Sequence, residues 1–422
     1  MIKKIGIIGL GTVGQATVKS IKKYSSLAAR RTSVKISIKG VCDADSSKRK
    51  IAKKLSIPFV SDAKSLINDP EIDTIVELIG GINPAKNFIM DSLNRGKCVV
   101  TANKALLAKH GKEIFALAKK VKKSVGFEAS VCGAIPIIKS ISQGLVCCDI
   151  KKIHGILNGT TNYILYKMGQ TRADFYSVLR EAQEKGLAEK NPHFDIDGID
   201  SLHKLCILSY ICFGVWPTPE KVYAQGISKI SLLDIVYAEE LNYRIKLLAI
   251  AKKEKNSLDL RVHPALVPIG HSLSEVSLAY NAVHLDTAPA GELLFEGVGA
   301  GGVATSSAVI SDIIGVSLGT NECLKNTREL SFQDIKNIKT RYYIRLMAKD
   351  EPGVLAKVSK ILANFKISIA SVKQKERNKE KLVPVIMLTH DAREENLAKA
   401  MRQIDQLSVI KNPSQIIRIE DL

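Results

Sequence analysis

The chain opens with Met1-Ile-Lys-Lys-Ile-Gly-Ile-Ile-Gly-Leu-Gly-Thr-Val-Gly-Gln15, in which a short apolar run leads into a glycine-rich turn. The apolar run predicts a buried strand of a parallel sheet, and the residues after the turn predict a helix. Gly9, Gly11 and Gly14 form the pattern G-x-G-x-x-G between them. In this setting the first glycine allows a tight turn, the second admits a pyrophosphate, and the third lets the helix pack on the strand. The helix start at Thr12 and Val13 offers free N–H groups to phosphate, so we expect a dinucleotide site.

Length and composition limit the class of protein. A chain of 422 residues exceeds one ordinary hydrophobic core, and we expect two or three domains. The composition, with 45% hydrophobic and 25% charged residues, is typical of a soluble globular protein. We expect neither a signal peptide nor a membrane span, and therefore a cytoplasmic protein with no membrane partner. The eight cysteines have no zinc-site spacing and predict free, buried thiols.

The net charge of +20 raises the question of a nucleic-acid partner. However, the lysines are scattered over predicted helix faces, and no nucleic-acid-binding motif with interleaved aromatic residues accompanies them. We therefore interpret the charge as a solvated, lysine-rich surface and expect no nucleic-acid partner.

Residues 1–130 alternate predicted strands and helices, which is typical of a Rossmann-type parallel sheet with crossover helices. The predicted strands are 5–8, 34–42, 57–60, 74–78, 97–101 and 124–127, and the helices lie near 13–30, 46–54, 84–94 and 105–122. Asp43 ends the second strand, where an acidic residue usually binds the ribose 2′-hydroxyl of NAD. Lys48 and Arg49 follow it and could bind the 2′-phosphate of NADP, so the choice of cofactor stays open and we expect both to be used.

Residues 131–320 predict an α+β domain built on an antiparallel sheet. Strand-like runs at 150–157, 262–268, 279–285 and 291–297 surround predicted helices at 174–185, 200–213 and 232–251. A glycine-rich turn at 297–302 precedes a helix near 304–318, which we expect to complete the first domain. Residues 321–340 are polar and predict a linker.

Residues 341–422 predict a third, compact domain. Strands at 342–348, 367–375, 382–389 and 416–419 alternate with helices at 354–365 and 394–406, and a charged hairpin is expected at 376–381. The order β-α-β-β-α-β is that of a ferredoxin-like unit.

Two lysines are candidates for chemistry. Lys204 follows Asp200 by four residues, so the two share a helix face beside apolar residues. From spacing alone this pair is as compatible with a structural ion pair as with a functional one, and a metal site at the carboxylates of this segment is less favoured because no octahedral ligand pattern is evident. Lys104 follows a predicted strand end, where ligands of open α/β sheets bind.

Several segments together resemble the homoserine dehydrogenase family over residues 1–320. They are the Gly9–Gly14 fingerprint, Thr101-Ala-Asn-Lys104, Glu128–Pro136, Asn158–Ile164, Gly186–Lys204 and Gly299-Ala-Gly-Gly302. The tail, with Asp350-Glu-Pro-Gly353, resembles an ACT domain, a regulatory module that binds small ligands. The chain thus resembles the long, feedback-regulated form of the enzyme, which acts in threonine and methionine biosynthesis.

The resemblance implies reversible oxidation of L-homoserine to L-aspartate 4-semialdehyde with NAD or NADP. It implies that Glu189 and Asp200 hold the substrate, that Lys204 transfers the proton, and that Lys104 is a second active-site lysine near the cofactor. Gly186, Gly301 and Gly302 match further cofactor contacts. Glu128, Val131, Gly133 and Ile135 match a monovalent cation site for Na⁺ or K⁺, formed largely by backbone carbonyls.

The resemblance also implies partners: the domain at 131–320 would bind substrate and form a homodimer or homotetramer, and the ACT domain would bind an amino acid, L-threonine being favoured. The sequence departs from the family pattern at four positions, namely Cys132 and Ala134 in the cation loop, and Leu187 and Asn191. None of these is the proposed acid–base group.

Two alternatives stay open. One is another Rossmann oxidoreductase of the same pathway, such as aspartate semialdehyde dehydrogenase, which needs a cysteine nucleophile with a nearby base. The other is a protein that senses cofactor and amino acid without catalysis. Retention of Lys104, Glu189, Asp200 and Lys204 argues against the second.

Overall fold

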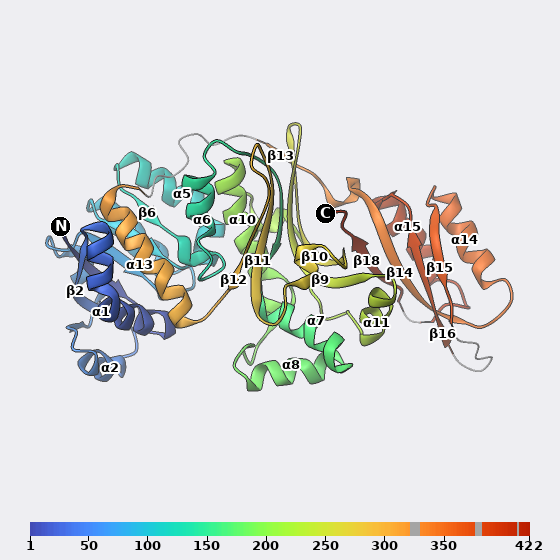
Figure 1. Ribbon diagram of the computed structural model, residues 1–422, viewed down its shortest axis with the longest axis horizontal. Helices are drawn as coiled ribbons and strands as arrows, with labels where there is room; N and C mark the ends of the chain where they lie inside the picture. Colours follow the sequence, from blue (N-terminus) through green and yellow to red (C-terminus); the bar gives the residue numbers. More distant parts are fainter. Residues whose placement is uncertain (321–329, 376–381, 412) are drawn as a thin grey trace. The chain divides into compact units, whose positions relative to one another are not determined.

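The computed structural model describes residues 1–320, 330–375, 382–411 and 413–422 (Figure 1). The chain groups into two units, each assembled from three segments, and each unit is considered by itself. The first unit contains Met1–Lys151, Asp200–Val222 and Tyr280–Glu329, and the second contains Lys152–Ile199, Tyr223–Ala279 and Leu330–Leu422. The domain boundaries at 130, 320 and 340 stay predictions. Cys323 and the hairpin expected at 376–381 lie outside the described residues.

The first unit contains a six-stranded parallel sheet in the order β3-β2-β1-β4-β5-β6. Its strands are β1 (Ile2–Ile8), β2 (Lys35–Cys42), β3 (Phe59–Val60), β4 (Thr74–Glu77), β5 (Cys98–Thr101) and β6 (Val125–Gly126). This is the strand order of dinucleotide-binding sheets, in which the switch point lies between β1 and β4. The Rossmann-type fold predicted for this part of the chain is therefore confirmed.

Helices cover this sheet and belong to the same unit. They are α1 (Thr12–Thr32), α2 (Lys48–Lys54), α3 (Ala63–Asn68), α4 (Ala85–Asn94), α5 (Lys104–Lys120), α6 (Ile137–Lys139) and α13 (Gly302–Leu318). Helix α13 packs beside α1, and Val309 and Ile313 join the core that contains Val18 and Ile21 (Figure 1). Helix α3 escaped the sequence analysis because its six residues are too few to show a clear helical period. The hairpin of β11 (Tyr280–Ala288) and β12 (Gly291–Val298) completes the strands of this unit.

The second unit is built on an antiparallel ladder of β7 (Asp149–Ile156), β9 (Tyr243–Glu254) and β10 (Ser257–Pro268). Its helices between β7 and β9 include α7 (Gly159–Thr171), α8 (Phe175–Glu184) and α9 (His193–Ile196). Helix α10 (Ile199–Phe213) belongs to the first unit from Asp200 onward. Helices α11 (Leu232–Glu240) and α12 (Ser272–Glu275) and the short strands β8 (Tyr223–Ala224), β13 (Ser331–Phe332) and β17 (Ala392–Arg393) complete the set.

The helix predicted at 232–251 is wrong beyond residue 240. Helix α11 ends at Glu240, Asn242 takes a left-handed conformation with φ 62°, and Tyr243–Glu254 is a strand that pairs with β10 over its whole length. Leucine, alanine and lysine in this window favour a helix in isolation. Pairing with β10 outweighs that preference because it buries the central residues of β9 on both faces.

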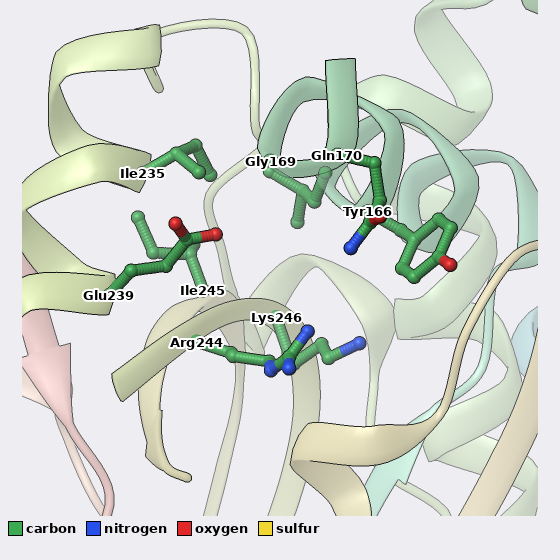
Figure 2. Close-up of a pocket in the computed structure, with 9 residues that line it drawn as sticks. Tyr166, Gly169, Gln170, Ile235, Glu239, Arg244, Ile245 and Lys246 are labelled. Carbon is green, nitrogen blue, oxygen red and sulfur yellow. The ribbon is translucent and has the colours of Figure 1, made fainter. Parts of the chain in front are cut away.

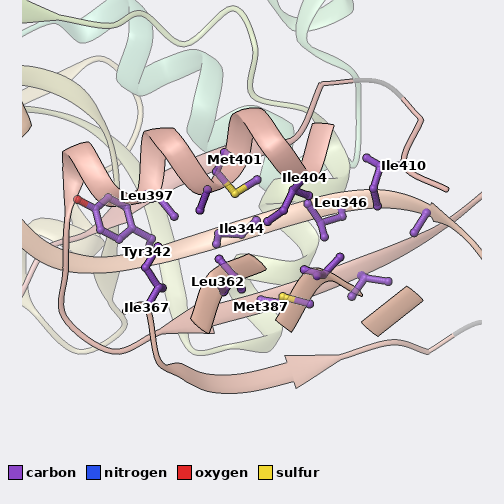
Figure 3. Close-up of a cluster of buried hydrophobic side chains, with 14 of the residues drawn as sticks. Tyr342, Ile344, Leu346, Leu362, Ile367, Met387, Leu397, Met401, Ile404 and Ile410 are labelled. Atoms are coloured by element: carbon purple, nitrogen blue, oxygen red, sulfur yellow. The ribbon is translucent and has the colours of Figure 1, made fainter. Parts of the chain in front are cut away.

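The C-terminal part of the second unit has the predicted ferredoxin-like order. It comprises β14 (Lys339–Lys349), α14 (Val354–Asn364), β15 (Ile369–Lys373), β16 (Leu382–Thr389), α15 (Glu394–Asp405) and β18 (Gln415–Ile419), with sheet order β18-β14-β16-β15. Tyr342, Ile344 and Leu346 alternate along β14 and face a core that both helices share (Figure 3). Leu362 of α14 and Met401 of α15 contribute to this core.

Strand β18 belongs to this sheet and also pairs with β10 in parallel, with Arg418 opposite Ala265. Directly after β18, the buried carboxylate of Glu420 accepts hydrogen bonds from Arg261 and Lys252, each at 2.7 Å. Burial acts to raise the pKa of Glu420, but the charges of Arg261 and Lys252 hold this pKa well below its usual range. The last strand is therefore joined to β10 by backbone pairing and by a buried ion cluster.

Two smaller expectations can be compared with the structure. Within the described residues no helix is long and apolar enough to cross a bilayer. The seven cysteines in the described part of the chain are free, as predicted. Only three of them are buried, namely Cys42, Cys132 and Cys206, whereas Cys98, Cys148 and Cys212 are half-buried and Cys147 is exposed. The adjacent pair at 147 and 148 follows the short helical stretch 140–144, where the chain turns at the surface.

Candidate functional site

The glycine-rich turn after β1 has room only for glycine at two of its three positions. Gly9 has φ +105°, and a Cβ atom there would lie 2.6 Å from the carbonyl oxygen of Leu78. At Gly14 a Cβ atom would lie 2.1 Å from the carbonyl oxygen of Gly9. Gly11, in contrast, has no heavy atom within 4 Å of its Cβ position, so this side of the turn is open to a ligand. Gly11 is also the N-cap of α1, and as a glycine it has no side chain that could cap the first N–H groups of that helix.

The turn borders a cavity of about 460 Å³ at the carboxyl ends of β1, β2 and β4. Asp43 lines this cavity, and its carboxylate accepts hydrogen bonds from the N–H groups of Leu10 at 2.6 Å and Asp45 at 2.9 Å. Asp62 is a second acidic residue in the lining, and no lysine or arginine of the described residues lines this cavity. The Lys48 ammonium lies 3.7 Å from Asp45, and the Arg49 guanidinium lies over the Phe59 ring.

The second glycine-rich turn approaches the first. A Cβ atom at Gly302 would lie 2.9 Å from the carbonyl oxygen of Thr12, so the start of α13 fits against α1 only with glycine at this position. Gly301 has φ +119° and open space around its Cβ position. The fold thus brings Gly301 and Gly302, which are distant in sequence, to the fingerprint turn.

In the first unit one carboxylate contacts two lysines, an arrangement called here the Lys104–Asp200–Lys204 clamp. Lys104 is the first residue of α5, and Asp200 and Lys204 lie one turn apart on α10. One Asp200 oxygen pairs with the Lys104 ammonium, and the other accepts from Lys204 Nζ at 2.8 Å. The side chains of Asp200 and Lys204 are only 2% and 9% exposed, whereas that of Lys104 is 36% exposed. The arrangement presents two ammonium groups that a fixed negative charge holds together.

Electrostatics keep Asp200 ionised in this clamp. Burial acts to raise the pKa of Asp200, but the positive charges of Lys204 and Lys104 outweigh burial and hold the pKa well below its usual range. A buried ion pair of this kind resists separation, because removing one partner leaves an uncompensated charge.

Aromatic packing fixes the two helices that carry the lysines. The Tyr210 ring of α10 stacks on Trp216 with centroids 4.3 Å apart, and Phe115 of α5 packs on both rings. Gly111 of α5 faces the Trp216 ring, which would lie 2.3 Å from a Cβ atom at that position. Helix α5 therefore approaches Trp216 closely and holds Lys104 at a fixed distance from α10.

Glu128 begins a tightly folded loop in the same unit. Its buried carboxylate accepts hydrogen bonds from the N–H groups of Ile138 at 2.7 Å and Lys139 at 2.9 Å. Burial, together with the nearby charge of Asp312, raises the pKa of Glu128 to about 7. Cys132 and Gly133 both have positive φ, at 55° and 49°. No group of three or more His, Cys, Asp or Glu side chains that could bind a metal occurs in the described part of the chain.

Two further residues named in the sequence analysis, Gly186 and Glu189, lie in the second unit. Gly186 has φ +70° and open space around it, and Glu189 is exposed on the loop that follows α8. The Gln183 side-chain amide donates to the backbone carbonyl of Glu189 at 3.0 Å. This contact fixes the backbone of the loop and does not involve the Glu189 carboxylate.

Asp195 had no role in the sequence analysis, but the structure gives it a defined partner. The side-chain amide group of Asn158 donates to an Asp195 oxygen at 2.8 Å. The side-chain oxygen of Asn158 accepts from the N–H of Thr161 and thereby caps α7. Asp195 is thereby held by the Asn158–Ile164 motif. The signal in the sequence was the motif itself, but spacing alone does not reveal that its first asparagine would contact a carboxylate 37 residues later.

A smaller cavity of the second unit has a different character (Figure 2). Tyr166, Gly169 and Gln170 from α7 face Ile235 and Glu239 from α11, and β9 closes the cavity with Arg244 and Lys246. Its volume of about 20 Å³ is enough for about one water molecule. It is too small for an amino acid or a dinucleotide, so we exclude it as a substrate site.

Comparison with known proteins agrees with these features. Three family profiles match the chain: homoserine dehydrogenase over residues 136–314, the homoserine dehydrogenase NAD binding domain over 9–128, and the ACT domain over 342–409. Homoserine dehydrogenase of Neisseria gonorrhoeae is 40% identical over 430 residues, which cover 99% of this chain and 98% of that protein.

Solved structures agree as well. A homoserine dehydrogenase from Thiobacillus denitrificans is similar with a TM-score of 0.93 and 40% identity, and the match covers 100% of this chain and 99% of that one. A hyperthermophilic archaeal homoserine dehydrogenase in complex with NADPH has a TM-score of 0.65 and 27% identity, over 78% of this chain and 100% of that one. The resemblance found in the sequence is thereby confirmed, and the chain belongs to the homoserine dehydrogenase family, in the form that carries a C-terminal ACT domain.

Proposed function

We propose that this chain interconverts L-homoserine and L-aspartate 4-semialdehyde, with a nicotinamide dinucleotide as the redox partner. The observation that carries the proposal is the Lys104–Asp200–Lys204 clamp, in a unit that also holds the open glycine turn and its cavity. When bound, the cofactor accepts hydride from the alcohol carbon or returns it to the aldehyde carbon. The protein must then move one proton to or from the substrate oxygen.

Lys204 is the residue we assign to that proton transfer. In the oxidation direction its amine accepts the hydroxyl proton, and in the reduction direction its ammonium donates a proton to the developing alkoxide. Lys104 stabilises the negative charge that develops on the same oxygen. Both oxygens of Asp200 already contact lysines, so we assign Asp200 to positioning them rather than to binding the substrate ammonium.

Two further carboxylates are proposed to bind the substrate ammonium. Glu189 has this role by its match to the family motif, and the proposal adds Asp195 because the Asn158 amide orients its carboxylate. Gly186 is proposed as a cofactor contact on the motif match alone.

For the cofactor we propose binding at Gly9, Gly11, Thr12, Val13, Gly14, Gly301 and Gly302, with a preference for NAD over NADP. Asp43 supports this preference, because the amides of Leu10 and Asp45 fix an acidic group in a cavity whose described lining contains no basic residue. The archaeal homoserine dehydrogenase solved in complex with NADPH supports use of the phosphorylated cofactor as well.

A monovalent cation, Na⁺ or K⁺, is proposed at the backbone carbonyls of Val131, Gly133 and Ile135, with Glu128 alongside. The fit is supported by the match of this loop to the family motif and by its tight turn, in which Cys132 and Gly133 both have positive φ beside the buried Glu128. Its function would be to hold the Glu128 loop in one conformation.

Regulation and assembly are further parts of the proposal. L-threonine is proposed to bind the ACT domain at the turn Asp350–Gly353, where Gly353 has φ +88° and begins α14. A homodimer or homotetramer is proposed on the exposed apolar residues of β12, among them Leu294 and Val298. The biosynthetic reaction supports a cytoplasmic location.

Initial rates with L-homoserine and each oxidised cofactor test the proposal, with and without L-threonine. Aldehyde-dependent oxidation of NADH or NADPH is the expected result in the reverse direction. Absence of turnover in a folded protein that still binds cofactor would instead identify the alternative, a sensor without catalysis. Aspartate semialdehyde dehydrogenase chemistry is disfavoured, because burial raises the thiol pKa of Cys132 to about 11 and that of Cys206 to about 12.

A further inference from the structure

A buried carboxylate that the proposed chemistry does not use lies at the end of β4. Glu77 is fully buried, and its partners in the described residues are hydrogen-bond donors without a cation. One oxygen accepts from the N–H groups of Ile79 at 2.9 Å and Gly80 at 3.3 Å, and the other accepts from the Thr101 hydroxyl at 2.6 Å. A buried carboxylate without a cation is costly, so its retention calls for an explanation.

The first oxygen of Glu77 shapes the wall of the dinucleotide cavity. Ile79 and Gly80 line that cavity together with Gly9 and Gly11. By accepting both N–H groups, Glu77 folds the segment after β4 into the conformation that faces the glycine turn.

The second oxygen of Glu77 is connected to Lys104 by a series of hydrogen bonds. Thr101 lies directly opposite Glu77 on β5, and its hydroxyl oxygen accepts the N–H of Asn103 at 3.0 Å. Asn103 then caps α5 through Leu106 N–H at 3.1 Å and donates to the carbonyl of Gly81 at 2.6 Å. Lys104 is the next residue, so this chain of hydrogen bonds fixes the start of the helix that carries it.

The hydrogen bonds around Thr101 suit an acceptor at residue 77. The Thr101 hydroxyl oxygen accepts from the N–H of Asn103, and the hydroxyl proton completes the network by donating to Glu77. A glutamine whose oxygen accepts from Ile79 and Gly80 would turn its amide group toward Thr101, which would then have to redirect its own proton to another acceptor. A glutamine turned the other way would place its amide group against the N–H groups of Ile79 and Gly80.

We propose that Glu77 is a positioning residue that couples the wall of the dinucleotide cavity to Lys104 through Thr101 and Asn103. The inference rests on the proposed function for Lys104 and for the cavity. It does not assign Glu77 to contact with the substrate.

The test compares Glu77→Gln, Thr101→Val and Thr101→Ser with Thr74→Val, a buried control at the opposite end of β4. For Glu77→Gln and Thr101→Val we expect kcat to fall roughly tenfold or more, because small displacements of catalytic groups lower the rate of the chemical step. NADH affinity, followed by its fluorescence, should fall several-fold in Glu77→Gln. Thr101→Ser retains the hydroxyl and should keep kcat close to the wild-type value, and Thr74→Val should change only thermal stability.

The outcomes separate this inference from the proposed function. Wild-type kcat and NADH affinity in a folded Glu77→Gln protein would overturn the inference while leaving the function intact. If Glu77→Gln does not fold, Thr101→Val decides: unchanged kcat overturns the inference, and a loss that Thr101→Ser restores supports it. If the wild-type protein binds NADH but does not oxidise homoserine, the proposed function fails, and NADH affinity alone then decides the role of Glu77.

Discussion

Lys204 Nζ lies 2.8 Å from Asp200 Oδ2 across one turn of α10, and the other Asp200 oxygen pairs with Lys104 of α5. A single buried carboxylate therefore sets the separation of two ammonium groups that come from different helices. Its charge offsets their mutual repulsion, so both lysines can approach the same substrate oxygen.

Replacement of Lys204 tests its role as the acid–base group. We expect Lys204→Ala to lower kcat by roughly a hundredfold or more, with a smaller change in the KM for homoserine. Lys185→Ala is the matched control, because Lys185 also pairs with a carboxylate four residues away but lies at the surface. Near-normal kcat in a folded Lys204→Ala protein, checked by circular dichroism, would sink the assignment.

Removal of the Asp200 charge should reduce stability in a pH-dependent manner. The folded-state pKa of Asp200 is lowered, so its stabilising effect is fully present above the ordinary aspartate pKa of about 4 and disappears as the pH falls through the folded value. We expect Asp200→Asn to cost about 3–5 kcal/mol at pH 7, as for other broken buried pairs.

Urea unfolding of wild type and Asp200→Asn at a series of pH values measures this difference. It should be constant between pH 7 and 5 and shrink in more acidic solution. Asp174→Asn, which alters an exposed cap of α8, serves as the control at the surface. A difference that grows toward acidic pH would contradict the sign of the Asp200 shift.

The substrate-binding carboxylates are tested by their amides. Glu189→Gln and Asp195→Asn should each raise the KM for homoserine more than they lower kcat, because they remove binding that ground state and transition state share. The dissociation constant for NADH should not change. Loss of NADH binding in either variant would mean that the residue serves the cofactor instead.

Asp43 offers a test of cofactor choice. We expect wild type to prefer NAD, and Asp43→Ser to shift the ratio of kcat/KM values toward NADP by roughly tenfold, equivalent to about 1.4 kcal/mol of repulsion. Asp45→Ser changes a neighbouring carboxylate that pairs with Lys48 and should shift the ratio less. If both variants keep the wild-type ratio, Asp43 does not face the ribose.

The ACT domain is better tested by a point variant than by removing it. Truncation after residue 330 would take β18 away from β10 and leave Arg261 buried without Glu420. We therefore expect the truncated chain to be poorly soluble or unfolded rather than active and deregulated. Gly353→Ala places a side chain at φ +88° in the proposed effector turn and should abolish inhibition by threonine with basal activity kept.

Steady-state inhibition curves distinguish these outcomes. Gly270→Ala is the control, because Gly270 also has a positive φ, at 100°, and open surroundings, but lies outside the ACT domain. Full threonine inhibition of Gly353→Ala would show that the effector binds elsewhere. A truncated chain that is soluble, active and insensitive to threonine would contradict the expected dependence on β18.

Local patterns predicted the parts of this fold in which neighbours in sequence are neighbours in space. The Gly9–Gly14 turn and the β-α-β-β-α-β tail are of this kind, because each carries its own turn residues and hydrophobic period. Strand β9 was mistaken for helix because its identity comes from pairing with β10, which no local pattern reveals.

The same distinction applies to the candidate site. Asp200 and Lys204 could be paired from their spacing, whereas the contact of Asp200 with Lys104 depends on how α5 packs on α10. No sequence pattern singled out Glu77. Its proposed role depends on Thr101, which lies opposite it on the neighbouring strand, and on the hydrogen bond from Asn103 to Thr101.

The parallel pairing of β10 with β18 has a consequence for how the protein is made. During synthesis β10 leaves the ribosome roughly 150 residues before β18, so Ala265 and Leu266 of β10 lack their backbone partners while the ACT domain is still being translated. During the same interval Arg261 lacks its ion-pair partner, the carboxylate of Glu420. Interrupted translation would release chains in which this part of the strand edge is unpaired, and unpaired strand edges favour aggregation. Completion of the regulatory domain is therefore also the step that closes this edge in the newly made chain.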